Sequence, residues 1–305
     1  MRRTAAEAAT RGCRAKRTAE ATAAMYQSKL NVADLNLASR MLLSNCEETA
    51  GHDVIVWNEQ NLTFVASIVV QLLVLVLSFV TIGIAKNLPE VLHTILWMET
   101  AVQLIEFLWY FFVAGSFVWG MRLTGRSCEF GVEFRYWDWL LTTPVMLLSL
   151  YFLLHYFASE GHCLTNEELT KKTAFWGFVV LIIFADLFML AIGYAYETER
   201  LGATPTNGLR RQAPMALGFV ALLCAFIPHF YTIGDTYTDE GIAFLLVTLF
   251  LWACYGLVAW YWMGRRGLIP KNAAYNVLDL LSKNAMGIVV SILALSFKST
   301  NGECP

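Results

Sequence analysis

Long apolar stretches separated by short polar segments dominate the chain from residue 62 onward. A helix needs about 20 consecutive apolar residues to cross the hydrocarbon core of a bilayer. The segments that reach this length are Leu62–Ala85, Val91–Ser116, Arg135–Phe157, Thr173–Tyr194, Ala213–Tyr231, Ile242–Met263 and Ala273–Phe297. Because backbone polar groups in lipid must be paired within their own segment, each stretch is predicted to be a helix. The expected fold class is therefore an all-α membrane protein, a seven-transmembrane-helix bundle.

The composition supports a membrane protein and excludes several other classes. The 305 residues are 57% hydrophobic and 15% charged, whereas roughly 25% of the residues in a soluble domain are charged. The 22 Lys and Arg residues nearly balance the 24 Asp and Glu residues, which disfavours a nucleic-acid binder because such proteins carry a basic surplus. Seven cysteines in a chain of this length are too few for a disulfide scaffold. The lipid bilayer is thus the expected surrounding partner.

The ends of the chain differ in character from the apolar bundle. Residues 1–60 form a polar N-terminal segment that is expected to be partly disordered and extracellular. Residues 61–298 form the seven-helix domain, and residues 299–305 a short cytoplasmic tail. The first 22 residues lack the apolar core of a secretory signal, so the first helix is expected to direct membrane insertion.

Several ionisable residues occur inside the predicted spans, where lipid disfavours them. A charged side chain at the centre of a bilayer costs at least about 2.5–3.5 kcal/mol on insertion scales. The residues concerned are Glu99, Glu106, Arg135, Asp138, Asp186, Asp279 and Lys283. We expect them to pair, to be protonated or to line water inside the bundle.

Two of these groups lie on the third and seventh helices. Asp279 and Lys283 are four residues apart and share one helix face. They could form a buried salt bridge, or Lys283 could be a desolvated amine able to form a Schiff base with an aldehyde. Arg135 lies one turn before Asp138, and Thr142 one turn after it. Because odd-numbered helices run in the same direction, Asp138 and Asp279 are predicted to converge on Lys283, and with Arg135 the charges would sum to zero.

A third group lies on the second helix. Glu99, Gln103 and Glu106 are spaced so that they share one stripe of the helix. A polar stripe about 10 Å long, at a rise of 1.5 Å per residue, suits a cation pathway through a membrane. The alternative is a pair of protonated glutamates that are hydrogen-bonded between helices.

The segment Arg-Tyr-Trp-Asp-Trp-Leu-Leu-Thr-Thr-Pro, from Arg135 to Pro144, resembles the third-helix signature of the microbial (type 1) rhodopsins. The resemblance extends over helices three to seven. It implies a seven-helix bundle that binds all-trans retinal through a protonated Schiff base on Lys283. It also implies that Asp138 is the counterion and primary proton acceptor. Asp279 would be the second counterion, with Arg135 as part of the same group.

The same resemblance implies a retinal pocket. Besides Lys283, its cofactor-binding residues are expected to be Trp139, Thr142, Thr143, Met146, Met189, Gly193, Trp252, Tyr255 and Ser282. Asp186 would be protonated and hydrogen-bonded to Thr143. Gly256 stands where the family usually has proline, and Trp260 is carried over to the aromatic wall of the pocket.

The triplet Asp138, Thr142 and Ser149 resembles a narrower group, the rhodopsins encoded by large viruses of marine protists. Members of this channelrhodopsin-like group are described as light-gated cation channels, and the same function is expected here. The predicted ion pathway comprises Glu99, Gln103, Glu106, Asn284 and Ser149. The expected partners are monovalent cations and protons, and relatives that form dimers or trimers imply a homo-oligomer.

Three alternatives to a channel stay open. The first is an outward proton pump with slow reprotonation, because Ser149 stands at the family's donor position and a hydroxyl relays protons poorly near pH 7; water, another acid or His155 could substitute. The second is a sensory photoreceptor that signals to a separate partner. The third is a transporter without retinal, in which Lys283 is merely paired to Asp279. None of these is an enzyme, and no metal site is expected.

The orientation of the chain receives opposite indications. The resemblance implies that the N-terminus is outside, in the plasma membrane. Basic residues would then gather in the outer connections, which is contrary to the positive-inside rule. Outside placement would also put Cys46 and Cys128 in an oxidising space where they could pair, although their placement could equally be due to chance.

Overall fold

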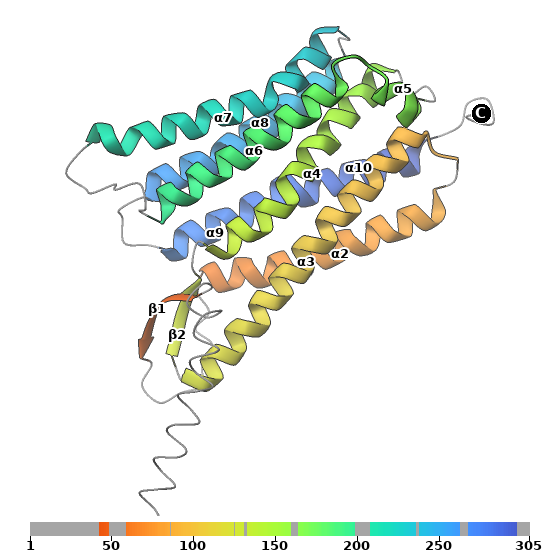
Figure 1. The fold of residues 1–305 in the computed structure, drawn as a ribbon. Coiled ribbons are helices and arrows are strands. Elements are labelled where there is room, and N and C mark those ends of the chain that lie inside the picture. The colour runs from red at the N-terminus through yellow and green to blue at the C-terminus, as the bar shows by residue number, and fades with distance from the viewer. Residues whose placement is uncertain are drawn as a thin grey trace, which may run out of the picture.

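Seven long helices form one bundle in the computed structural model (Figure 1). The structure describes residues 43–48, 59–85, 87–124, 126–130, 133–159, 164–198, 208–235, 238–262 and 268–297. Within this part of the chain, the spans apolar enough to cross a membrane are Gln60–Ile84, Glu90–Gly115, Phe134–Ala158, Phe175–Glu197, Gln212–Gly234, Asp239–Tyr261 and Pro270–Ser296. All seven predicted spans are thereby confirmed, with their ends displaced by a few residues.

Each of the first six spans is a single helix, and the seventh contains three helical elements. The single helices are α2 (Glu59–Ile84), α3 (Glu90–Thr124), α4 (Glu133–Ala158), α6 (Phe175–Glu197), α7 (Gly208–Asp235) and α8 (Asp239–Trp262). The seventh span consists of α9 (Leu268–Asp279), the π-helix η1 (Leu280–Asn284) and α10 (Ala285–Ser296). A short helix, α5 (Asn166–Thr170), precedes α6. Helical backbone angles at both junctions of η1 keep the seventh span continuous.

The π-helix contains Lys283 and is supported by α3. π-Helices occur mostly as single turns inside α-helices and often at functional sites. Here the side chain of Gln103 donates a hydrogen bond from Nε2 to the backbone oxygen of Lys283, over 2.9 Å. A side chain of a neighbouring helix thus holds the irregular turn that positions the lysine.

The distribution of side chains suits a lipid environment. Large apolar residues face outward on several helices, for example Trp176, Phe184 and Phe250, whose exposed fractions are 64%, 68% and 66%. In water such a surface would be an aggregation liability, whereas lipid tails solvate it. Buried apolar residues such as Leu147 and Phe226 form the core of the half of the bundle near α5.

Two short strands extend the structure beyond the predicted bundle. β1 (Leu43–Glu48) pairs antiparallel with β2 (Arg126–Phe130) at the end of the bundle away from the C-terminus (Figure 1). The sequence pattern did not predict these strands, because the segments were interpreted as a polar tail and a loop. The register places Cys46 opposite Cys128, which is compatible with a pairing between them. Their side chains lie outside the described part, so whether the two cysteines pair stays open.

The two predicted terminal segments lie largely outside the described part of the chain. Of the N-terminal segment 1–60, the structure describes only β1 and the first two residues of α2. The tail 299–305 lies wholly outside the described residues. Because α2 begins at Glu59, the helical domain starts two residues before the predicted boundary.

Asn276 joins three helices and provides a test of this packing. Its Nδ2 donates to Thr63 Oγ1 of α2 over 2.8 Å, and its Oδ1 accepts from Arg135 Nη2 of α4 over 2.6 Å. Replacing Asn276 by Leu leaves the buried guanidinium short of an acceptor. Because an unsatisfied buried polar group costs about 1–3 kcal/mol, more when charged, we expect destabilisation of about 2–3 kcal/mol. Thermal unfolding followed by circular dichroism in detergent measures it. Val277→Leu, on the lipid-facing side of the same helix, is the control, and equal stability of the two variants would contradict this packing.

Candidate functional site

The centre of the bundle contains a buried lysine held by two carboxylates. The side chain of Lys283 is 1% exposed. Its Nζ donates a hydrogen bond to Oδ2 of Asp138 on α4 and forms an ion pair with that carboxylate. Oε1 of Glu106 on α3 lies 3.7 Å from the same nitrogen. Two carboxylates from different helices therefore converge on one amine.

The second of these carboxylates differs from the one predicted. The spacing along the seventh helix favoured Asp279, either as a joint partner of Lys283 or as its salt bridge. Within the described residues, Asp279 instead forms its ion pair with Arg135, with Nη1 and Oδ2 3.0 Å apart. Asp279 still contributes to the electrostatic field at the amine. Sharing a helix face thus brings Asp279 near Lys283 without direct contact, because Arg135 takes the carboxylate.

A dense hydrogen-bond network fixes Asp279 in place. Its Oδ2 accepts from the hydroxyl of Tyr110 over 2.6 Å, in addition to the bond from Arg135. Its Oδ1 accepts from the hydroxyl of Tyr255 over 2.8 Å and from Nε1 of Trp139 over 3.3 Å. Four donors from α3, α4 and α8 therefore stabilise the charged carboxylate.

The cluster carries more negative than positive charge. Oxygen atoms of Glu106, Asp138 and Asp279 lie within 4.8 Å of one another. These three carboxylates face two cations, Arg135 and Lys283, so full ionisation leaves one net negative charge. The sequence predicted a sum of zero because it did not place Glu106 here. In a low dielectric, this excess favours the uptake of a proton or another cation.

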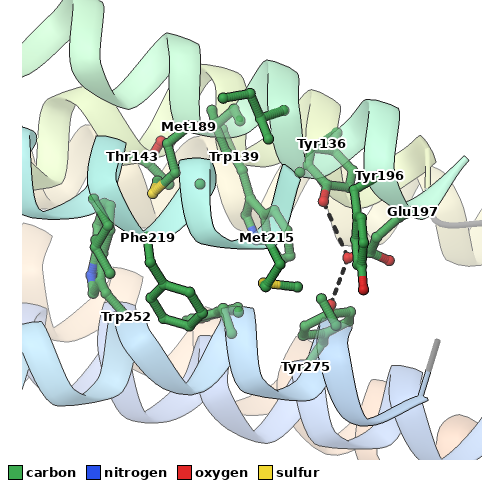
Figure 2. Close-up of a pocket in the computed structure, with 18 of the residues that line it drawn as sticks. Tyr136, Trp139, Thr143, Met189, Tyr196, Glu197, Met215, Phe219, Trp252 and Tyr275 are labelled. Carbon is green, nitrogen blue, oxygen red and sulfur yellow. Dashed lines mark hydrogen bonds between the residues drawn. The ribbon is translucent and has the colours of Figure 1, made fainter. Parts of the chain in front are cut away.

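A cavity of about 820 Å³ lies beside Lys283. The predicted pocket residues that line it are Trp139, Thr143, Met146, Met189, Gly193, Trp252, Tyr255, Ser282 and Lys283. Figure 2 shows Trp139 and Trp252 on two of its walls. Thr142 is absent from this lining among the described residues; it is fully buried, and its hydroxyl donates to the backbone oxygen of Asp138 over 2.9 Å. Nearly all of the proposed pocket residues therefore line the cavity.

One predicted wall residue is wrong. Trp260 is 54% exposed on the outer surface of α8, and Ala259 lines the cavity instead. One residue corresponds to a rotation of about 100° on a helix with 3.6 residues per turn, which is enough to turn Trp260 away from the pocket. Packing explains why position 256 is a glycine, since a Cβ there would lie 2.8 Å from the ring of Phe219. The glycine lets Phe219 complete the wall.

The expected contact between helices α4 and α6 is confirmed. Thr143 Oγ1 donates to Asp186 Oδ2 over 2.8 Å, and Asp186 is fully buried. The same hydroxyl lies 2.8 Å from the backbone oxygen of Trp139. The bond anchors a wall of the cavity at the level of the lysine.

The closed end of the cavity contains a group that the sequence did not predict. Glu197, in the last turn of α6, accepts hydrogen bonds at Oε1 from Tyr275 over 2.7 Å and from Tyr136 over 3.1 Å (Figure 2). Its other carboxylate oxygen forms a buried ion pair with Lys271 of α9. The sequence did contain an indication of this pair, because Glu197 follows the fourth predicted span and Lys271, of opposite charge, precedes the seventh. The cluster closes the pocket toward the strand end of the bundle.

The predicted ion-pathway residues are buried together beside the cavity. Glu99, Gln103 and Glu106 are each 0% exposed and lie on one face of α3, as their spacing predicted. Unpaired polar atoms are common here. Within the described residues, buried atoms without a hydrogen-bond partner occur on Gln71, Glu99, Gln103, Glu106, Ser149, Asn284 and Ser291. The predicted alternative, glutamates hydrogen-bonded between helices, stays open, because the Glu99 carboxyl lies within reach of the Ser149 side chain on α4.

Known proteins resemble the chain over most of its length. Residues 58–297 match the family described as bacteriorhodopsin-like protein. The blue-light absorbing proteorhodopsin of Gamma-proteobacterium Hot 75m4 is 26% identical over 185 residues, which cover 54% of this chain and 62% of that protein. The alignment thus spans less than two thirds of this relative.

Two solved structures share the fold. The blue light-absorbing proteorhodopsin from Med12 superposes with a TM-score of 0.55 at 19% identity, over 78% of this chain and 98% of that one. Xanthorhodopsin, described as a light-driven ion pump with dual chromophore, gives a TM-score of 0.59 at 17% identity, over 77% and 93% of the two chains. At such low identities, these superpositions establish a common fold and nothing more. The family match, by contrast, covers more than half of the sequence and establishes the family. The chain therefore belongs to the bacteriorhodopsin-like family of microbial (type 1) rhodopsins, whose members bind retinal.

Proposed function

We propose that this protein is a light-gated cation channel with all-trans retinal bound to Lys283, similar to the channelrhodopsin-like proteins of viruses and protists. The observation that carries the proposal is the row of buried polar side chains along α3 with oxygen atoms that lack a hydrogen-bond partner within the described residues, one end of which reaches Lys283. In this proposal the protein moves ions without chemical conversion of a substrate, so it is not an enzyme. We further propose a homo-oligomer, a dimer or trimer, in the plasma membrane with its N-terminus outside.

The lining of the cavity suits retinal, because it is mainly apolar and aromatic and contains Lys283. Trp139, Trp252 and Tyr255 would contact the polyene, and Met189 and Gly193 the ring. When bound, retinal supplies absorption of visible light and a change of shape on isomerisation. Asp138, which contacts Lys283, stabilises a positive charge at the lysine nitrogen.

The stripe on α3 provides acidic and amide groups for a cation. Glu99 and Glu106 are seven residues apart, about 10 Å at 1.5 Å per residue, and Gln103 lies between them. All three have side-chain oxygens without a hydrogen-bond partner within the described residues. Rings or rows of carboxylates favour cations in pores. The excess negative charge of the cluster around Lys283 acts in the same direction.

Further buried polar groups lie on the three other spans that pack against α3. Gln71 lies on α2, Ser149 on α4, and Asn284 and Ser291 on the seventh span, and all are buried with unpaired atoms. Leaving one such group unsatisfied costs about 1–3 kcal/mol. Ordered water meets this need in roomy polar sites. A hydrated path between α2, α3, α4 and the seventh span accounts for the whole set.

An outward proton pump is the second candidate, and the contact between Asp138 and Lys283 favours it. A proton acceptor must lie within hydrogen-bond reach of its donor, and Asp138 does so. Xanthorhodopsin, which shares the fold, is described as a light-driven ion pump. Ser149 offers no carboxyl for fast reprotonation, so such a pump would turn over slowly.

The covalent attachment of retinal at Lys283 can be tested by colour. Purified protein supplied with all-trans retinal should develop a visible absorption band, because the buried amine lies in the cavity next to its counterion. Lys283→Ala should lose this band completely, whereas Lys172→Ala, a lysine outside this cavity, should keep it. A band of equal intensity in the Lys283→Ala protein would exclude attachment at this residue.

Photocurrents against voltage test the ion pathway. In cells that express the protein, the light-induced current should reverse sign with the cation gradient. Glu99→Gln should reduce the conductance on the order of tenfold, the effect of about 1.4 kcal/mol of lost cation stabilisation. Its visible absorption should stay nearly unchanged, because Lys283 pairs with Asp138 and Glu106.

Glu167→Gln, an exposed glutamate on α5, is the matched control and should leave the current unchanged. A current of one direction at every voltage would instead indicate the pump. An unaltered conductance in Glu99→Gln would remove this glutamate from the pathway.

A further inference from the structure

A second cavity lies at the opposite end of the bundle from the strands, between α4, α6 and α7. It measures about 680 Å³, and its lining includes Tyr151, His155, Lys172, Thr173 and Tyr231. These positions are close to the ends of their membrane spans. The cavity shares no lining residue with the retinal pocket, and the proposed channel does not require it.

The hydrogen bond between Lys172 and His155 determines which ring nitrogen carries the proton. Lys172 Nζ lies 3.1 Å from His155 Nδ1. An ammonium group has only donors, so Nδ1 of the neutral ring must accept. The hydrogen of the imidazole is then on Nε2. His155 is 7% exposed, and its Nε2 has no hydrogen-bond partner within the described residues. The cavity wall therefore contains a buried N–H donor that lacks an acceptor.

Two further features make this cavity electropositive. The ammonium of Lys172 borders it, and helix α6 begins at Phe175, in its wall. The N-terminus of a helix carries a partial positive charge and free N–H groups, and it attracts anions. The N-cap residue, Ala174, makes no side-chain hydrogen bond to this terminus. Of the residues described around the cavity, none has a carboxylate.

Nearby acidic side chains are engaged elsewhere. Glu167 forms an ion pair with Lys171 over 2.5 Å, and Glu168 accepts hydrogen bonds from Thr165 in the cap of α5. The positive charge of Lys172 is thus directed at a histidine ring and at the cavity, and no described ion pair neutralises it.

We propose that this cavity binds a phosphate group, supplied either by an anionic phospholipid headgroup or by free phosphate. Phosphate oxygens accept hydrogen bonds from N–H donors, and a helix N-terminus with a lysine is a common way to hold them. The exposed side chain of Tyr231 lines the cavity, and the exposed Trp176 directly follows Phe175 of its wall. Aromatic residues of this kind gather at the level of the lipid headgroups, which places the cavity where a headgroup phosphate can reach it.

The test uses full-length protein with its histidines labelled with ¹⁵N, and follows the Nε2–H signal of His155 by NMR. One arm adds inorganic phosphate to protein in uncharged detergent, against chloride at equal ionic strength. The other compares phosphatidylcholine bilayers with and without phosphatidylglycerol. Lys172→Gln removes the charge at an exposed position, and Lys171→Gln, the adjacent lysine with its own partner, is the matched control.

We expect the signal to shift on addition of phosphate, of phosphatidylglycerol, or of both, in the natural protein and in Lys171→Gln. The affinity should fall on the order of tenfold in Lys172→Gln, as expected for the loss of a charged hydrogen-bond donor. A shift only with phosphatidylglycerol identifies a lipid headgroup, and a shift only with inorganic phosphate identifies free phosphate. No shift in either arm, or equal losses in the two lysine variants, would overturn the proposal. Because the photocurrent is not measured, this result is independent of the channel.

Discussion

The ion pair between Lys283 and Asp138 is the interaction on which the rest of the structure depends. A buried charge without a partner is so costly that removal of one member of such a pair typically destabilises a protein by about 3–5 kcal/mol. The lysine must therefore remain on the inner face of the seventh span, and Asp138 must remain opposite it on α4. Arg135 and Asp279 form a second pair beside the first. Together the two pairs hold α4 against the seventh span.

Much of the fold and the centre of the site could be predicted from the sequence because lipid imposes simple rules. The length of the apolar stretches predicted all seven spans. An ionisable side chain in a membrane span must face inward. The burial of Lys283, Asp138 and Asp186 therefore followed from their positions within the apolar stretches. The resemblance to a known family then supplied nine of the residues that line the cavity. Local spacing was sufficient for these residues because each one is placed by its own helix.

The features that could not be predicted depend on how different helices meet. Glu106 reaches Lys283 only because of the depth at which α3 packs against the seventh span. Glu197 and Lys271 are far apart in the sequence, and their side chains meet only in the folded bundle. The phase of α8, which decides that Ala259 lines the cavity and the next residue faces outward, is likewise set by tertiary packing. Spacing along one helix carries no information on these contacts.

The connection between the lysine and the polar stripe bears on the choice between channel and pump. Gln103 lies in the middle of the stripe, and its side chain holds the backbone oxygen of Lys283. Gly287 leaves little free space there, since a Cβ on it would lie 3.1 Å from Gln103 Nε2. A displacement of the π-helix at Lys283 must therefore move Gln103, between the two glutamates. A pump needs only a proton relay at the lysine, whereas a gate needs mechanical coupling of the lysine to the pathway. In the proposed channel, the hydrogen bond between Gln103 and Lys283 would supply that coupling.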